Sequence, residues 1–188
     1  MNKQINIIIS VLGAVILIIG ALFYMNIIKI QHNIINTETK QTFQFKTLKG
    51  KVFDIKADER RFQIKGMENK VVFLKIFGWN CAFCKKEIPE LINLKKNLPD
   101  TFDVIAIEAQ NHTTKESKDF IRNFDINYHI IEGKNQKDFY TYLQKQYGWT
   151  GVIPLTIVLS KDGYVLAFER GSKSYSLSEL FQASLTKK

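Results

Sequence analysis

The two cysteines of this chain, Cys81 and Cys84, stand in the sequence Cys-Ala-Phe-Cys. They follow an apolar run, residues 71–78, and open a helix-like stretch that Pro89 interrupts. At a strand-to-helix junction, the free backbone N–H groups of the first helical turn favour the charged form of the first thiol. The second thiol, one turn later, is placed to resolve a mixed disulfide. The spacing therefore predicts dithiol redox chemistry.

The same spacing also fits half of a zinc site or a static disulfide. A structural zinc ion needs four ligands, and the histidines available to supply the other two are His32, His112 and His129. His32 stands beside a predicted membrane segment and is a poor candidate. A disulfide that closes so small a ring restricts the unfolded chain very little and offers little stability. Redox chemistry is favoured, with no metal and no cofactor beyond the cysteine pair.

The start of the chain predicts a membrane anchor. Residues 5–28 are nearly all apolar and, as a helix, long enough to cross a hydrocarbon core of about 30 Å. A cleaved signal peptide, the alternative, would have a shorter apolar region of about 7–15 residues and a small-residue cleavage site. We therefore expect an uncleaved anchor over residues 1–29, a linker over residues 30–41 and one folded domain over residues 42–188.

The charges around the apolar run orient it only weakly, because Lys3 precedes the run and Lys29 follows it. A long C-terminal domain crosses a membrane largely regardless of its charge. We expect a single-pass protein of the bacterial cytoplasmic (inner) membrane. Its domain would lie on the periplasmic, or extracytoplasmic, side, and residues 5–28 would contact lipid.

The charge pattern of the domain points away from nucleic acid. The net charge of +9 falls to +7 without Lys3 and Lys29, and the other lysines are scattered among 18 acidic residues. This pattern indicates a solvated surface, with attraction to anionic headgroups near the anchor as a second interpretation. An exported domain without an arginine-rich stripe is not expected to bind nucleic acid.

Strand and helix patterns alternate along the domain. Alternating apolar residues over 42–46 and 51–55 predict a half-exposed hairpin. Denser apolar runs at 71–77 and 103–107 predict central strands with both faces covered. The fold class is therefore α/β, with a mixed central sheet flanked by helices. The other predicted elements are strands at 128–131, 155–159 and 164–168, and helices at about 81–97, 115–123, 136–147 and 176–185.

Further motifs surround the cysteines. Pro89 stands eight residues after Cys81, residues 147–156 read YGWTGVIPLT, and a Lys-Asp-Gly turn follows at 161–163. With the strand 71–77 and the CAFC motif, these features resemble the thioredoxin superfamily. The resemblance is to membrane-anchored bacterial thiol-disulfide oxidoreductases of the TlpA, ResA and CcmG type, and it covers nearly all of the domain.

The resemblance implies a thioredoxin-like fold with an N-terminal hairpin extension and a site built from Cys81, Cys84 and Pro154. The family's proline follows a cis peptide bond. Such a turn would set the backbone of Ile153 against the cysteine pair, as an edge for a substrate chain. On the sequence alone, the alternative is a trans proline that merely begins a strand.

The surroundings of the motif depart from the family pattern. The family usually has Trp directly before the first cysteine, whereas here Asn80 stands there and Trp79 lies one place earlier. The partner-facing surface is therefore expected to differ. Phe83, together with Phe77, Trp79 and Trp149, is a candidate apolar rim for docking protein substrates, and core packing is the alternative.

Two charged residues are candidates for tuning the thiols. Lys75 occupies the position, six residues before Cys81, where relatives carry a buried Asp or Asn. It would stabilise a thiolate if charged or relay a proton if desolvated, unless its side chain extends out of the core. Glu108, which ends a predicted strand, is a candidate acid–base group because several relatives keep a carboxylate near the buried cysteine. An ordinary strand-end carboxylate is the alternative.

The resemblance implies that Cys81 attacks a substrate disulfide and that Cys84 resolves the mixed disulfide. It further implies reduction of exported proteins with thiols or disulfides, such as apocytochrome c, with electrons from a membrane thiol carrier of the DsbD or CcdA type. Two rival functions stay open. One is a Sco-like copper-delivery module that would use the cysteines with His112 or His129. The other is a tethered, non-enzymatic protein-binding domain.

Overall fold

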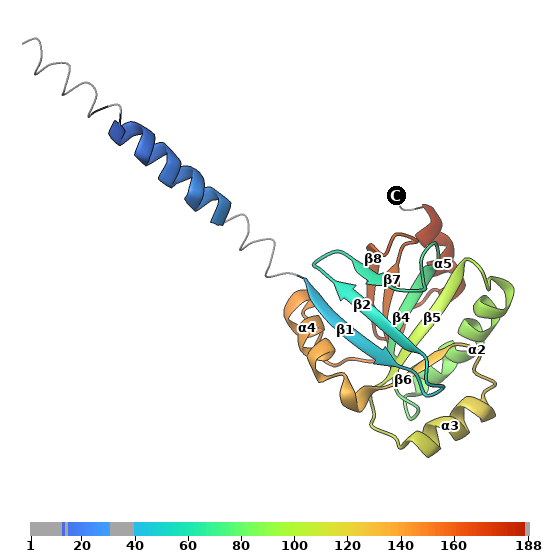
Figure 1. Cartoon of the computed structure of the whole chain (residues 1–188). Helices are drawn as coiled ribbons and strands as arrows, with labels where there is room; N and C mark the ends of the chain where they lie inside the picture. Colours follow the sequence, from blue (N-terminus) through green and yellow to red (C-terminus); the bar gives the residue numbers. More distant parts are fainter. Residues whose placement is uncertain (1–12, 14, 31–39, 187–188) are drawn as a thin grey trace, which may run out of the picture. The chain divides into compact units, whose positions relative to one another are not determined.

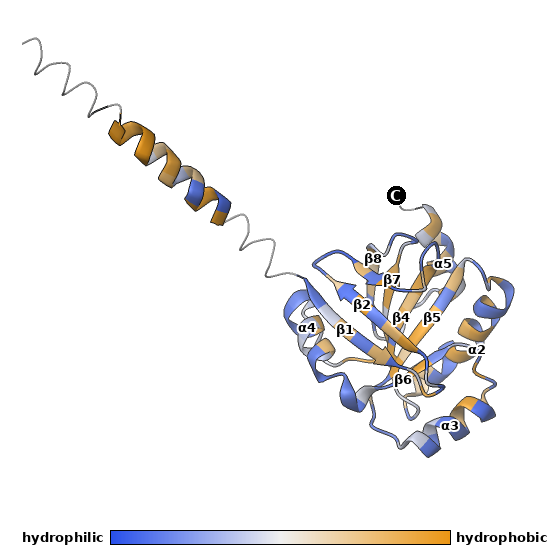
Figure 2. Cartoon of the chain, in the orientation of Figure 1, coloured by the Kyte–Doolittle hydropathy of each residue, from blue (hydrophilic) through white to orange (hydrophobic). Residues whose placement is uncertain are grey.

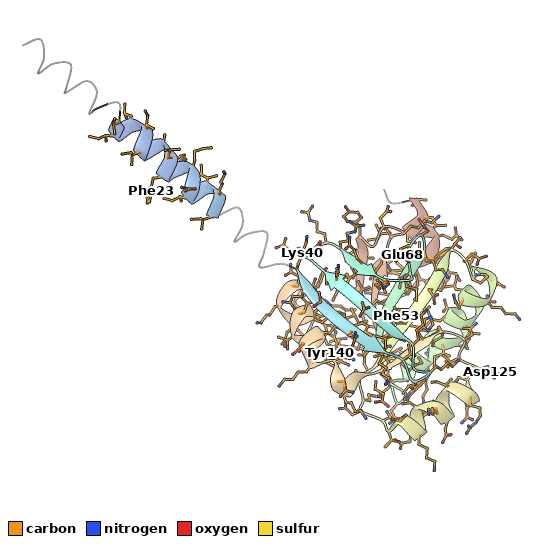
Figure 3. The ribbon with its side chains drawn as sticks, in the orientation of Figure 1. Phe23, Lys40, Phe53, Glu68, Asp125 and Tyr140 are labelled. Atoms are coloured by element: carbon orange, nitrogen blue, oxygen red, sulfur yellow. A yellow bond between two sulfur atoms is a disulfide. The ribbon has the colours of Figure 1, made fainter. Side chains whose placement is uncertain are left out.

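The computed structural model describes residue 13, residues 15–30 and residues 40–186. The chain divides into two units, Met1–Lys40 and Gln41–Lys188. In the first unit, residues 15–30 are helical, and their apolar side chains, Phe23 among them, are exposed (Figure 3). No helix within the described ranges is both long and apolar enough to cross a membrane. Much of the predicted anchor and linker, residues 1–12, 14 and 31–39, lies outside the described residues.

The second unit is built on a five-stranded mixed sheet (Figure 1). Its strand order is β6-β5-β4-β7-β8; β4, β5 and β6 are parallel, and β7 is antiparallel to both of its neighbours, β4 and β8. Strands β4 and β5 are buried along their whole length, as their apolar runs predicted, and both are largely orange in Figure 2. The strands are β4 (Val71–Phe77), β5 (Phe102–Glu108), β6 (His129–Glu132), β7 (Leu155–Leu159) and β8 (Val165–Arg170).

A second, three-stranded antiparallel sheet precedes the main one in the chain. It consists of β1 (Gln41–Lys46), β2 (Val52–Ala57) and β3 (Phe62–Ile64), in that order. The predicted hairpin is β1 and β2, in which Phe45 pairs with Phe53. Strand β3 was not predicted, because three residues are too few for an alternating pattern to stand out.

Helices cover both faces of the main sheet (Figure 1). Pro89 does not interrupt α2, contrary to the sequence prediction. Proline has no backbone N–H, so α2 lacks the hydrogen bond that another residue at position 89 would donate to the carbonyl four residues earlier. The helix tolerates the loss of this one bond. The helices are α2 (Ala82–Asn97), α3 (Thr114–Asn123), α4 (Lys137–Tyr147) and α5 (Leu177–Thr186), with a short 3-10 turn, η1 (Gly133–Asn135).

Alternate residues of β4 belong to two different cores, because successive side chains of a strand point to opposite faces. Val72, Leu74 and Ile76 pack with the N-terminal sheet and α4, the elements that carry Phe53 and Tyr140 in Figure 3. Residues of the other parity, including Phe73, pack with α2 and α5 on the opposite face. Lys75 shares that parity, so the strand directs it beneath the helix that begins at the cysteines.

Candidate active site

The CAFC motif lies at the junction between β4 and α2. After β4 ends at Phe77, a turn closes with a hydrogen bond from the Cys81 N–H to the carbonyl of Gly78 (3.1 Å). Cys81 is the N-cap of α2, in extended conformation, and its carbonyl accepts from the N–H of Lys85 (3.0 Å). The first cysteine therefore stands at the positive end of a 16-residue helix, as the sequence predicted.

Cys81 and Cys84 are joined in a disulfide, with their Cα atoms 5.2 Å apart. The N–H of Cys84 points at Cys81 Sγ, 3.1 Å away, so a charge on that sulfur has a backbone donor ready. Cys81 is half-buried, whereas Cys84 is only 3% exposed. A partner can therefore reach the sulfur of Cys81 more readily than that of Cys84.

The second loop at this edge of the sheet carries the cis peptide bond between Ile153 and Pro154, which confirms the implied cis proline. Leu155, the next residue, pairs with Ile76 near the end of β4, so both loops leave the same edge of the sheet. Trp149 Nε1 donates to the carbonyl of Val152 (2.9 Å) and closes the preceding turn. Val152 is 47% exposed, and Ile153 is half-buried.

The aromatic rim is smaller than predicted. Trp79 is fully buried: its Nε1 donates to Ser117 Oγ (3.1 Å), and its ring stacks on Phe120 of α3. Phe77 and Trp149 are buried as well, so none of these three offers a docking surface. Phe83 alone among the four predicted rim residues is exposed, at 53%, between the two cysteines in sequence.

A buried ion pair lies beneath α2. Lys75 Nζ, on a side chain only 2% exposed, is 2.9 Å from Glu87 Oε2 and donates a hydrogen bond to Thr156 Oγ1 on β7. Burial lowers the pKa of Lys75, and the neighbouring Glu87 carboxylate opposes that shift. Lys75 thus stays in the core rather than extending out of it. Glu87 was not predicted, although its spacing of three residues from Cys84 on one helix was the available signal.

Glu108 is buried at the end of β5, where it binds a loop rather than a sulfur. Its carboxylate accepts hydrogen bonds from the backbone N–H groups of Gln110 (2.9 Å) and His112 (3.2 Å), and it contacts His112 Nδ1 (3.1 Å). Gln110 Oε1 in turn accepts from the N–H of Asn80 (2.7 Å). Glu108 therefore reaches the site through His112 and Gln110, two residues that the sequence did not single out for this role.

The histidines of the copper hypothesis have other partners. His129 lies on β6 with its Nε2 3.7 Å from Asp103 Oδ1, and its ring contacts Phe53. His112 lies between Glu108 and Asn80. Among the described residues, no group of three His, Cys, Asp or Glu side chains is arranged to hold a metal.

A cavity of about 650 Å³ is lined by residues that include Val72 and Leu159. Val72 is near the start of β4, whereas Cys81 follows the end of that strand. The cavity therefore opens at the other end of the sheet from the disulfide. Cys81 is half-buried and its neighbours Ala82 and Phe83 are exposed, which suits a substrate that is itself a protein surface.

A disulfide at the start of a helix, beside a cis proline on a mixed sheet, defines the class of thiol:disulfide exchange proteins. The family model described as Thioredoxin-like matches residues 69–165, and the chain belongs to this family. The chain is 26% identical over 130 residues to the thiol-disulfide oxidoreductase ResA of Bacillus thuringiensis, which covers 68% of this chain and 70% of that relative. The predicted resemblance to enzymes of the ResA type is confirmed, and the chain is a protein thiol:disulfide oxidoreductase.

Solved structures show the same fold. StoA from Bacillus subtilis aligns with a TM-score of 0.55 and 19% identity, over 76% of this chain and 95% of that one. A protein described as a thiol:disulfide interchange protein DsbE from Chlorobium tepidum aligns with a TM-score of 0.58 and 17% identity, over 78% and 95%. The predicted thioredoxin-like α/β fold is thereby confirmed.

Proposed function

We propose that this chain is a membrane-anchored, extracytoplasmic oxidoreductase that reduces protein disulfides with Cys81 and Cys84. The observation that carries the proposal is the asymmetry of the pair. Cys81 is accessible at the helix N-cap, whereas Cys84 is buried behind it with its N–H directed at the first sulfur. The loop with the cis Ile153–Pro154 bond leads into the strand that pairs with β4, and it leaves Val152 exposed and Ile153 half-buried to meet an extended substrate segment.

The reaction begins with the reduced dithiol. The Cys81 thiolate attacks one sulfur of the substrate disulfide, a new S–S bond forms, and the other substrate sulfur leaves as a thiolate that takes up a proton. Cys84, once deprotonated, attacks Cys81 Sγ and releases the second substrate thiol. Two electrons and two protons pass to the substrate, and the enzyme ends as the Cys81–Cys84 disulfide.

The resolving step needs an acceptor for the proton of the buried Cys84. Glu87 lies three residues further along α2, on the neighbouring turn, and the buried ammonium group of Lys75 holds its carboxylate in place. We assign the proton transfer to Glu87, with Lys75 positioning its carboxylate. No cofactor besides the cysteine pair takes part.

Regeneration requires a reductant, because extracytoplasmic compartments are oxidising. The apolar residues 5–28 would hold the domain at the membrane, near a dithiol carrier of the DsbD or CcdA type. The relatives' name, thiol-disulfide oxidoreductase, supports proteins with thiols or disulfides as substrates, and we propose that these are exported proteins. Apocytochrome c, whose cysteines must be reduced before haem attachment, is the substrate we propose to test first.

The test is to trap the mixed disulfide in cells. In the full chain with Cys84→Ser, Cys81 can attack a substrate but the mixed disulfide cannot be resolved. Covalent adducts that a reductant cleaves should therefore accumulate. The matched control is the Cys81→Ser/Cys84→Ser double variant, which should give none. Adducts should carry exported proteins, each with one free thiol while it is attached to Cys81 and two free thiols after the reductant releases it.

Two outcomes would contradict the proposal. If Cys84→Ser forms no more adducts than the double variant, Cys81 is not the nucleophile. If the midpoint potential of the full chain, equilibrated with glutathione, lies near that of DsbA rather than that of thioredoxin, the enzyme oxidises its partners instead of reducing them.

A further inference from the structure

Two exposed lysines, Lys85 and Lys86, directly follow Cys84 within the first two turns of α2. The Lys85 N–H donates to the carbonyl of Cys81 (3.0 Å), so Lys85 lies one helical turn beyond the nucleophile. Side chains of a helix lean toward its N-terminus, so these positions direct long side chains back toward the cysteines. Lys86 shows this lean, because its Nζ lies 5.4 Å from the centroid of the Phe83 ring.

The position of the two lysines opposes the electrostatics of the helix. The N-terminus of a helix carries a partial positive charge, which disfavours cations nearby. The first turn of α2 has no acidic residue to offset them. Among the described residues, neither ammonium group has a carboxylate within ion-pair distance. The lysines thus break a local rule without a compensating contact inside the fold, which is typical of positions used for binding.

The acidic side chains near the site are engaged by groups within the fold. Glu87 pairs with the buried lysine beneath α2, and the carboxylate of Glu90 accepts the first backbone N–H of α5 (2.7 Å). Glu108 is buried and bound to its own loop, and Glu116 closes the capping box of α3. The charge that α2 leaves exposed beside the cysteines is therefore positive.

The loop that holds the cis peptide bond adds no negative charge. Residues 149–160 contain no charged side chain. Beside them, the exposed Arg170 pairs with Leu155 at the beginning of β7, and the N–H of Gly171 donates to the carbonyl of Pro154 (2.7 Å). A further cation thus stands at the edge of the sheet from which the CAFC motif leaves.

We propose that Lys85 and Lys86 make the enzyme selective for disulfides flanked by acidic residues. The inference rests on the proposed function, since it concerns the substrate that Cys81 attacks. Aspartate or glutamate next to a substrate cysteine is attracted to the two ammonium groups as the disulfide approaches Cys81, whereas lysine or arginine there is repelled. Such exposed charges act mainly on the rate of association, and added salt weakens them.

The experiment measures single-turnover reduction of three peptide disulfides by the pre-reduced full chain in a non-ionic detergent at neutral pH. Each substrate is a symmetric dimer of a blocked peptide whose single cysteine is flanked by Glu, by Gln or by Lys residues. Dithiothreitol reduces the same three peptides in parallel, because flanking charges change the intrinsic reactivity of a disulfide. Dividing each rate constant of the enzyme by that of dithiothreitol leaves the contribution of the enzyme surface.

We expect the normalised rate constant of the native chain at low salt to be about threefold to twentyfold higher for the acidic peptide than for the neutral one, the range that two exposed charge pairs support. The basic peptide should be slower than the neutral one. In Lys85→Gln/Lys86→Gln the three values should lie within about twofold of one another. Any loss of thiolate stabilisation at Cys81 slows all three reactions alike and cancels in the comparison. In the native chain, about 0.5 M salt should remove most of the preference.

The matched control, Lys96→Gln/Lys161→Gln, removes the same charge at two exposed positions far from the site. Lys96 is in the last turn of α2, about 22 Å along the helix from Cys81. Lys161 follows β7 at the other end of the sheet. This variant should keep the native preference. The urea midpoint of Lys85→Gln/Lys86→Gln should not fall, because the change removes cations from a helix N-terminus.

The inference is wrong if the native chain reduces the acidic and neutral peptides at equal normalised rates, or if Lys85→Gln/Lys86→Gln keeps the preference. It is also wrong if the control variant loses the preference, since the charge of the whole chain would then set it. A fall in the urea midpoint of Lys85→Gln/Lys86→Gln would assign the lysines to the fold instead. If the native chain reduces none of the three peptides while dithiothreitol reduces them all, the proposed function itself fails.

Discussion

Lys75 Nζ and Glu87 Oε2 lie 2.9 Å apart in the core, one on the central strand and the other on the helix that carries both cysteines. Lys75 is 2% exposed, whereas the Glu87 side chain is 16% exposed. Burial disfavours both charges, and each is tolerated because the other is present. The pair therefore connects the centre of the sheet to the turn of α2 that follows Cys84, and each partner has a different measurable consequence.

Removing Glu87 should destabilise the fold more than removing Lys75. Glu87→Gln leaves the fully buried ammonium group without its counter-charge, and we expect a loss of about 3–5 kcal/mol in the free energy of unfolding. Lys75→Met should cost less, because the remaining carboxylate reaches solvent and the methionine fills the space of the lysine stem. The double variant Lys75→Met/Glu87→Gln should recover much of the loss. Urea unfolding of the native chain and the three variants measures the loss of unfolding free energy in each variant. If the loss in the double variant equals the sum of the two single losses, the two side chains do not act as a pair.

The two thiols of the reduced chain should react at different rates. Cys81 is half-buried with a helix N–H directed at its sulfur, and Cys84 is almost fully buried. Iodoacetamide should therefore label Cys81 at least about tenfold faster than Cys84 at neutral pH. Peptide mass spectrometry after short pulses gives both rates. Cys81→Ser supplies the control, since its remaining thiol should stay slow, and equal labelling of the two cysteines in the native chain would refute the asymmetry.

Phe83 should contribute to docking and not to stability. Its exposed ring, which has the ammonium group of Lys86 5.4 Å from its centroid, stands between the two cysteines. Phe83→Ala should lower the rate of reduction of a protein disulfide by about fivefold to tenfold, as expected for an aromatic side chain buried in an interface. Rates with a small disulfide should not change, and the free energy of unfolding should stay within about 0.5 kcal/mol.

Tyr164→Ala is the matched control for Phe83. Tyr164 is also an exposed aromatic residue with a cationic neighbour, Arg61, but it lies next to β8 near the far end of the sheet. Its loss should leave protein-disulfide reduction at the native rate. If both variants slow the reaction equally, Phe83 has no special role in docking.

The sequence was a reliable guide wherever a pattern was local. Strands 71–77 and 155–159 have their predicted bounds, because each is a mostly apolar run with a single polar residue, Lys75 or Thr156. The CAFC helix begins where predicted, since the cysteine itself is the cap. The short strand Phe62–Ile64 depends instead on pairing with β2 and was not predicted, because the residues alone carry too little of a pattern.

The side-chain environment of the site could not be predicted, because it depends on residues distant in sequence. Trp79 is buried because Ser117 and Phe120, about forty residues later, supply a hydrogen-bond acceptor and a stacking surface. Likewise, the role of Glu108 depends on a loop that folds back over Asn80. Residue type and spacing identified the nucleophile, whereas packing determined which neighbours tune it.

His129 should make the fold less stable in mild acid. Burial lowers the pKa of His129 below its usual value, with Asp103 opposing the shift, so the unfolded chain takes up a proton there more readily than the folded one. Stability from this group is complete above the unfolded pKa of about 6.5 and is lost as the pH falls through the lower folded value. The urea midpoint should therefore drop between pH 7.5 and pH 5, and His129→Gln should reduce that drop. The control is Arg122→Gln, because the Arg122 side chain is exposed and stays charged throughout this pH range; this variant should show the native drop in the urea midpoint. If His129→Gln also shows the full native drop, groups other than His129 cause it.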